Sequence, residues 1–401
     1  MSMQWDLRSP ELGYFDEGAD LTDAATYRAV TLPFGQATAM PAVAYRSKIF
    51  VELENENIWT RSWVAIGLLQ QIPNPGDLLP FTIGFHGVHV QRNKDGTISA
   101  RMNRHQHGGC RFVPEQCRTG AQTKCSIASC NYTRDSDVMP ATESGENTDL
   151  MYKFVGLVPE KLTPVKCDTW GSIIFVNLDP DCRPLGECFD LHNGESIAKF
   201  IAPLKLEFKQ WVDFACNWKA AGSAFVDLGS RPPEDSAPAI SVEAMMGWGS
   251  KGDDGTPSVL GVMARGDEGC RLAWILPNTL IVFHADGVVV ILLQANGASK
   301  SLCRVFALSS QVAPKEVDAA PFFASDLATL IAAARAHAEN LHKDFAERGT
   351  SLRPDTTVDE SPIERNYASY LLNGFLASKL TQKHHYHWSA PIMDAALTMR
   401  R

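Results

Sequence analysis

Cysteine side chains gather in one stretch of this chain, where their chemistry could matter. Ten cysteines run from Cys110 to Cys303, and four of them, Cys110, Cys117, Cys125 and Cys130, fall between residues 110 and 130. The cysteines show no repeating framework. In a reducing compartment such thiols are more often buried or bound to metal than joined in disulfides. The sequence therefore indicates a candidate metal site in this cluster.

Short predicted strands come before and after the cluster. They are rich in β-branched and aromatic residues, and they cover residues 62–68, 77–83, 87–92, 98–102 and 171–177. Turn signals separate them at Asn74-Pro75-Gly76-Asp77 and at Lys94-Asp95-Gly96. Pro180 follows the last strand and ends it. This pattern predicts a small antiparallel β domain that closes near residue 180.

The segments before and after this β domain have sequence patterns that predict an irregular arm, helices and further strands. Residues 1–45 have few apolar repeats and are expected to form an irregular arm, and residues 47–62 have the periodicity of a helix. After residue 180, a helical stretch at 187–200 and a long helix at 322–347 enclose further strands. Those strands are predicted at residues 211–216, 272–276, 279–284, 288–293 and 301–309. We therefore predict an α+β fold with an arm (1–45) and two domains (46–180 and 181–401).

Composition excludes several classes of function. The chain has 401 residues, a net charge of −9 and a pI near 5.7, which gives no electrostatic reason to expect a nucleic acid or an anionic membrane as partner. No apolar stretch is long enough to cross a bilayer, and residues 1–20 are polar and acidic rather than signal-like. The sequence therefore predicts a cytoplasmic protein.

Between residues 40 and 390 the chain resembles the α subunits of the Rieske non-heme iron oxygenases, which include the aromatic ring-hydroxylating oxygenases. The matching residues occur in the family's order: Tyr45, Trp63-Val64, Pro75-Gly76-Asp77, Arg92, Asp95-Gly96, Ala100, Asn103, Gly156-Leu157, Val165, Trp170-Gly171, Phe175-Val176-Asn177, Pro184-Leu185, Asn217-Trp218-Lys219 and Pro277-Asn278. The resemblance implies an N-terminal Rieske-like antiparallel β domain and a C-terminal helix-grip (START-like) α+β domain. It also implies a ring of subunits in which a [2Fe–2S] cluster passes electrons to a mononuclear iron that activates O₂.

The family holds its cluster with the motifs Cys-x-His and Cys-x-x-His. Here the first motif reads His105-Gln106-His107, with histidine where cysteine is expected, and the second begins at Cys125 but has Ala128 at the histidine position. Two of the four ligands are therefore replaced.

Three interpretations of this loop remain open. The loop could bind nothing, because histidine and cysteine are ordinary residues in turns. Alternatively, His105, His107, Cys125 and Cys130 form a His₂Cys₂ set that suits tetrahedral zinc. A third interpretation keeps an iron–sulfur cluster with one loop giving both imidazoles and the other both thiolates.

The family's iron is held by two histidines and a carboxylate, and the histidines are expected soon after Asn217-Trp218-Lys219. The degenerate iron-site positions are Asp227, Arg231 and Ser236, and Arg231 and Ser236 stand where the histidines are expected. Arg231 either replaces the metal's charge by pairing with nearby carboxylates or is a solvated residue in a proline-rich loop. The carboxylate ligand is expected among Asp355, Asp359, Glu360 and Glu364.

Both metal sites are thus altered, and three functions compete. We predict no catalytic residues and a catalytically degenerate α-like subunit that assembles, as trimer or hexamer, with a complete α subunit as its structural or regulatory partner. The first alternative is an active oxygenase, hydroxylating or demethylating a small organic substrate at an unorthodox metal site. The second is a small-molecule binding protein that uses the old substrate pocket. The predicted cofactor is zinc at the former cluster loop, with neither a [2Fe–2S] cluster nor mononuclear iron expected.

Overall fold

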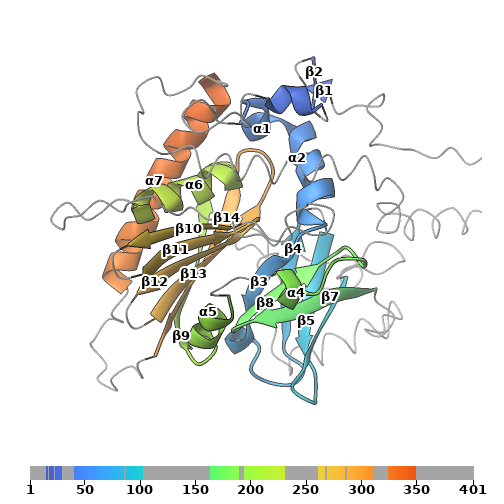
Figure 1. Ribbon diagram of the computed structural model, residues 1–401, viewed down its shortest axis with the longest axis vertical. Coiled ribbons are helices and arrows are strands. Elements are labelled where there is room, and N and C mark those ends of the chain that lie inside the picture. Colours follow the sequence, from blue (N-terminus) through green and yellow to red (C-terminus); the bar gives the residue numbers. More distant parts are fainter. Residues whose placement is uncertain are drawn as a thin grey trace, which may run out of the picture. The chain divides into compact units, whose positions relative to one another are not determined.

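A computed structural model of the chain describes residues 15–16, 18–21, 23–28, 40–84, 86–102, 163–188, 194–230, 261–266, 269–284, 287–310 and 324–348. These residues divide into two compact units. One unit consists of Thr60–Leu185, and the other joins the residues up to Trp59 with those from Gly186 onward. Each unit contains one six-stranded antiparallel sheet, so the structure confirms the predicted α+β class (Figure 1).

The Thr60–Leu185 unit is the small β domain that the sequence predicts. Its sheet runs in the order β3-β8-β7-β6-β5-β4. The strands are β3 (Val64–Leu68), β4 (Leu78–Ile83), β5 (His86–Arg92), β6 (Ile98–Met102), β7 (Pro164–Trp170) and β8 (Ile173–Asn177). Every residue of β3, β4 and β8 is buried, which identifies these strands as the core. A 3₁₀ turn, η4 (Leu69–Gln71), follows β3.

Arg92, one of the residues that carries the family resemblance, supports the end of this sheet. Its guanidinium donates hydrogen bonds to the carbonyl oxygens of Ile72 (2.9 Å), Gly96 (2.9 Å) and Leu69 (3.2 Å). Two of these carbonyls belong to the turn after β3 and the third to the turn before β6. Arg92 therefore ties two turns together, which explains why a planar side chain with several donors is used there.

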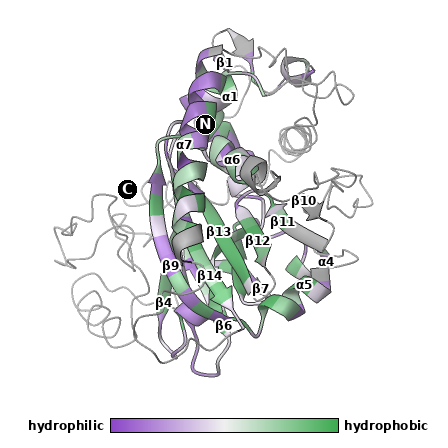
Figure 2. Cartoon of the chain, turned by 90° about the vertical axis from the view of Figure 1, so that its left-hand side faces the viewer, coloured by the Kyte–Doolittle hydropathy of each residue, from purple (hydrophilic) through white to green (hydrophobic). Residues whose placement is uncertain are grey.

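The sheet of the second unit runs in the order β10-β11-β12-β13-β14-β9. Its strands are β9 (Lys205–Phe214), β10 (Gly261–Gly266), β11 (Gly269–Ile275), β12 (Thr279–His284), β13 (Gly287–Ala295) and β14 (Ser301–Ser309). Figure 2 shows β13 as hydrophobic and the edge strand β9 as hydrophilic. Central strands are buried on both faces, whereas an edge strand meets solvent, and this explains the contrast.

Two helices, α6 (Trp218–Ser230) and α7 (Ala324–Arg348), pack on each other and on this sheet (Figure 1). The buried face of α7 follows the helical period at Leu327, Ile331, Ala334, Ala338 and Leu341. Two shorter helices, α4 (Leu185–Cys188) and α5 (Gly194–Ile201), lie in the stretch predicted as one helix at 187–200.

The N-terminal helices belong to this second unit. They are η2 (Ala24–Tyr27), α1 (Val43–Arg46), α2 (Lys48–Glu54) and a π-helical turn, η3 (Asn55–Trp59), after a short β1 (Phe15–Asp16) and β2 (Ala19–Asp20) pair. The predicted boundary at residue 46 assigned α2 and η3 to the β domain, whereas the structure groups them with the later sheet. The physical reason is a set of buried contacts from α1 and α2 to α6 and α7. The predicted boundary near residue 180 lies close to the observed division at Leu185.

Most of the predicted strands are present, with their ends shifted by a few residues. The strand predicted at 211–216 begins earlier, at Lys205. The sequence prediction missed β7, β10 and the helix α6, and the predicted irregular arm contains the short elements β1, β2, η2 and most of α1. None of the helices in the described ranges is long and apolar enough to cross a membrane.

Candidate functional site

The predicted metal ligands lie mostly outside the described residues. His105, His107, Cys125 and Cys130 fall between residues 103 and 162, and Arg231 and Ser236 fall between 231 and 260, two stretches that the description leaves out. Asp227 lies in α6, of which only the backbone is described at that position. The four candidate carboxylates between residues 355 and 364 also lie outside it. The structure therefore shows the elements that lead into both candidate sites.

The cluster loop leaves and re-enters the β domain through adjacent strands. It follows β6 and precedes β7, and these strands pair with Ala100 opposite Val165. The backbone N–H of Met102 donates to the carbonyl of Thr163, at 2.8 Å. The residues on either side of 103–162 are thus held side by side, at the end of β6 and the start of β7 in the middle of the sheet.

Helix α6 leads to the candidate iron site, and Asn217 fixes where it begins. The Asn217 Oδ1 atom accepts a hydrogen bond from the backbone N–H of Lys219 at 3.1 Å, which caps the helix. The Asn217 Nδ2 atom donates to the carbonyl of Ala298 at 2.8 Å, in the turn between β13 and β14. A single buried amide therefore attaches the start of α6 to the sheet beneath it.

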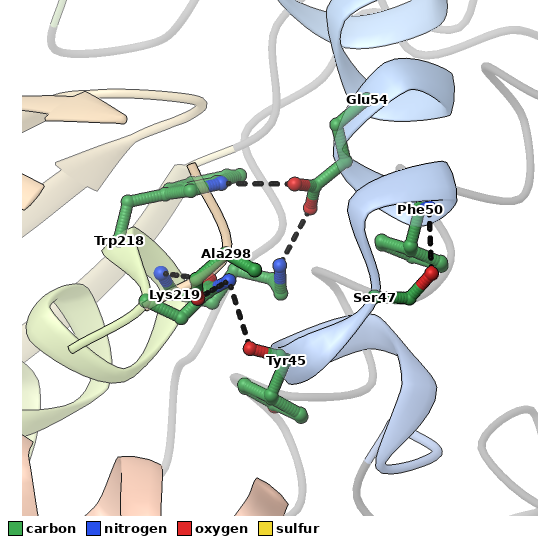
Figure 3. Close-up of polar contacts among 8 residues, drawn as sticks. Tyr45, Ser47, Phe50, Glu54, Trp218, Lys219 and Ala298 are labelled. Carbon is green, nitrogen blue, oxygen red and sulfur yellow. Dashed lines mark hydrogen bonds and ion pairs between the residues drawn. The ribbon is translucent and has the colours of Figure 1, made fainter. Parts of the chain in front are cut away.

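A buried ion pair attaches the same turn of α6 to α2 (Figure 3). The Lys219 Nζ atom lies 2.7 Å from Glu54 Oε1, and the Trp218 Nε1–H donates to Glu54 Oε2 at 3.2 Å. Both charged residues are 1% exposed. The carboxylate thus binds two consecutive side chains of α6.

Aromatic rings surround the Lys219 ammonium. The centroids of the Phe50, Tyr45 and Trp218 rings lie 5.2, 5.3 and 5.4 Å from Nζ, within the range of cation–π attraction. Burial lowers the pKa of Lys219, and the attraction of Glu54 restores part of the shift. A charge at this depth requires such compensation, because transfer from water is costly without it.

Helix α6 then runs closely over the sheet. The ring of Phe225 stacks on that of Phe214 in β9 with centroids 5.9 Å apart. A β-carbon at Gly222 would overlap the indole of Trp274 in β11, so the helix backbone packs directly on that ring. Asp227 follows on the next turns of the helix.

Histidine and cysteine side chains within the described ranges form no site of their own. No group of three or more His, Cys, Asp or Glu side chains that could hold a metal occurs there. Burial raises the pKa of Cys167 and of Cys216 to about 12, so both thiols stay protonated at neutral pH. Burial lowers the pKa of His89 to about 3, with a smaller contribution from Arg101, so that ring is neutral.

Sequence reasoning missed Glu54, the acidic partner of Lys219. It was visible only as a polar position in the helix predicted at residues 47–62. A signal existed: Lys219 lies in an apolar stretch of the sequence, between Phe214 and Phe225. A lysine buried in such a stretch needs a carboxylate. Sequence alone could not show which of the chain's 46 acidic residues supplies it.

Comparison with known proteins gives relatives of one kind. The α subunit of benzene 1,2-dioxygenase from Pseudomonas putida is 27% identical over 194 residues, which are 45% of this chain and 40% of that protein. The α subunit of biphenyl 2,3-dioxygenase from Rhodococcus jostii is 29% identical over 196 residues, 45% of this chain and 39% of that one. The chain thus spans about two-fifths of the length of these curated relatives. No protein-family model matches the chain.

Solved structures share the fold over most of the chain. The quaternary ammonium Rieske monooxygenase CntA, in complex with gamma-butyrobetaine, superposes with a TM-score of 0.58 at 15% identity, covering 87% of this chain and 97% of that one. Naphthalene 1,2-dioxygenase from Rhodococcus sp. gives 0.53 at 16% identity, covering 84% and 94%. The comparisons by sequence and by fold agree: the chain is similar to the α subunits of Rieske oxygenases.

Proposed function

We propose that this chain is an α-like subunit without a working iron site, and that it serves as a structural or regulatory partner of a complete α subunit. The observation that carries the proposal is a count along the sequence: no histidine lies between His192 and His284. The segment after Asn217-Trp218-Lys219, where the family resemblance expects two histidines, therefore contains none. A site of two histidines and one carboxylate does not fit these residues.

The retained framework supports assembly with a related subunit. Asn217, Trp218 and Lys219 are buried and hydrogen-bonded, and the strands on either side of the cluster loop remain paired. Closed rings of like-folded subunits accept a related chain at one position, because the interfaces repeat. We place the mixed oligomer in the cytoplasm, as trimer or hexamer.

The cluster loop is proposed to hold zinc through His105, His107, Cys125 and Cys130. Two imidazoles and two thiolates match the ligands that tetrahedral zinc takes in structural sites. Metal analysis of the purified chain should find about one zinc per chain and no stoichiometric iron. His105→Ala and Cys125→Ser should each release the zinc, whereas Cys182→Ser, at a half-buried cysteine outside the loop, should retain it.

Co-purification tests the partner role. The chain is expressed with and without a complete Rieske oxygenase α subunit from the same source, and the mass of the complex is measured in solution. We expect a mixed oligomer whose iron content corresponds to the complete subunits alone. Stoichiometric iron in this chain by itself would overturn the proposal in favour of an active oxygenase, and the lack of any mixed complex would count against the partner role.

A further inference from the structure

The Glu54–Lys219 pair joins two helices in a way that stability alone does not explain. Both residues are 1% exposed, and aromatic rings surround the Lys219 ammonium. The free energy needed to remove two charges from water offsets much of their mutual attraction. Apolar residues of similar size therefore often give the protein equal stability. A buried ion pair does, however, accept only a narrow range of geometries, and its role is better sought in position.

The contacts of the Glu54 carboxylate constrain α6 in two directions. Oε1 binds the Lys219 ammonium at 2.7 Å and Oε2 accepts from the Trp218 indole at 3.2 Å. Consecutive residues leave a helix about 100° apart, because a turn holds 3.6 residues. A rotation or a slide of α6 would therefore lengthen at least one of the two bonds.

The π-helical turn η3, which follows α2, adds a second contact to the first turn of α6. Trp59, the last residue of the π-helical turn after Glu54, packs edge-on against Trp218 with centroids 5.0 Å apart. The indole of Trp218 is the same ring that donates its N–H to Glu54. Helix α2 and its π-helical extension thus hold the first turn of α6 by both a polar and an aromatic contact.

A helix transmits this constraint along its length. Asp227 follows Lys219 by eight residues within the same helix, a rise of about 12 Å. A change in the rotation of the first turn therefore moves the end of α6. In the sequence, Arg231, the first of the expected histidine positions, comes directly after Ser230, the last residue of this helix.

We propose that Glu54 is a positioning residue, which sets the rotation and height of α6 and so places the helix backbone at Asp227. The link between α6 and the former iron site rests on the proposed function, whereas the positioning of α6 by Glu54 does not. The experiment below measures α6 itself and needs neither metal nor partner. Its failure is therefore distinct from failure of the proposed function.

Hydrogen exchange of the full chain tests the proposal in three variants. In Glu54→Leu/Lys219→Met the pair is replaced by apolar side chains, and we expect the thermal midpoint to stay near that of the wild type. Amide exchange in residues 222–230 should nevertheless rise about tenfold relative to β13. Glu54→Asp keeps the charge on a shorter side chain and should also make amide exchange in α6 faster. This variant provides the test if the double variant does not fold.

The matched control is Ile291→Val in β13, a fully buried position in the sheet that is not part of the pair or of the aromatic rings around Lys219. It should accelerate exchange evenly over the unit, because it lowers global stability alone. The proposal is overturned if the double variant folds with wild-type exchange in α6, or if α6 and β13 accelerate equally in both Glu54 variants. A purely structural pair predicts that second pattern.

Discussion

Charge burial is the main physical feature at the scale of single residues. Lys219 and Glu54 form an ion pair at two almost fully buried positions, and each charge would be left uncompensated if the other were removed. The exposed pair of Lys199 and Glu195, also 2.7 Å apart, differs because water already solvates both groups. The two ion pairs therefore have the same N–O distance, but only loss of the buried pair is expected to lower the stability of the protein.

Replacing Lys219 by methionine should destabilise the chain by about 3–5 kcal/mol, because Glu54 would remain buried without its cation. Urea unfolding followed by tryptophan fluorescence measures the loss. Lys199→Met serves as the matched control and should leave the midpoint unchanged. Equal effects of the two substitutions would contradict the role of burial.

His342 on α7 predicts a pH dependence of stability. Burial lowers the pKa of this imidazole, and the nearby Lys219 charge lowers it further. Among the described contacts its Nδ1 atom has no hydrogen-bond partner. Because the folded pKa lies below the unfolded value of about 6.5, stability is full above that pH and is lost as pH falls toward the folded pKa.

The expected result is a free energy of unfolding that declines below pH 6.5 in the wild type and declines less in His342→Gln. Urea unfolding at a series of pH values between 5 and 8 measures both slopes. Parallel slopes in the two proteins would show that other groups carry the dependence.

At the scale of elements, the position of α6 on the sheet depends on one glycine. Glycine is unfavourable within a helix by about 1 kcal/mol relative to alanine. At Gly222 this cost is accepted because a β-carbon would overlap the Trp274 indole, which is itself held by a hydrogen bond from its Nε1–H to the Pro277 carbonyl at 3.2 Å. Close packing outweighs helix propensity there.

Gly222→Ala should therefore destabilise the chain by about 1–3 kcal/mol, the usual cost of overpacking. Gly186→Ala in α4 is the control, because a β-carbon there meets open space and should be neutral or slightly stabilising. Thermal unfolding measures both. A stabilised Gly222→Ala variant would show that α6 shifts away from Trp274 at little cost.

At the scale of the whole molecule, one unit is built from segments far apart in the sequence. Helix α1 stacks Tyr45 on Phe345 of α7, with centroids 4.6 Å apart, and donates from Arg46 Nη1 to the carbonyl of Ala346 at 2.6 Å. Helix α2 supplies Glu54 to α6. The N-terminal residues are therefore part of the core of the unit that otherwise begins at Gly186.

A chain that begins at residue 60 should fail to fold this unit, because Lys219 would lose Glu54 and the aromatic rings of α1 and α2. Limited proteolysis and circular dichroism of chains that begin at residues 40 and 60 provide the comparison. We expect protease-resistant helix α7 in the longer chain alone. Equal resistance of the two chains would contradict the assignment of α2 to this unit.

The local pattern was sufficient to predict most of the strands. Residues 98–102 and 301–309 were predicted with the observed limits, because alternation and β-branched content act within the strand itself. Helix α6 was missed because Gly222 and small residues weaken its helical signal. Strand β7 was missed because its exposed and buried residues, from Pro164 to Trp170, are polar enough to read as a loop.

By itself, the sequence determined the α+β class, the resemblance to Rieske oxygenases and the lack of histidine between His192 and His284. All three follow from the types of the residues and their order along the chain, which the sequence gives directly. Only the tertiary structure decided that α2 belongs with the second sheet and that Glu54 is the partner of Lys219. Those facts depend on which residues meet across 165 positions of chain, and the pairing of one buried charge with another leaves no local pattern in the sequence.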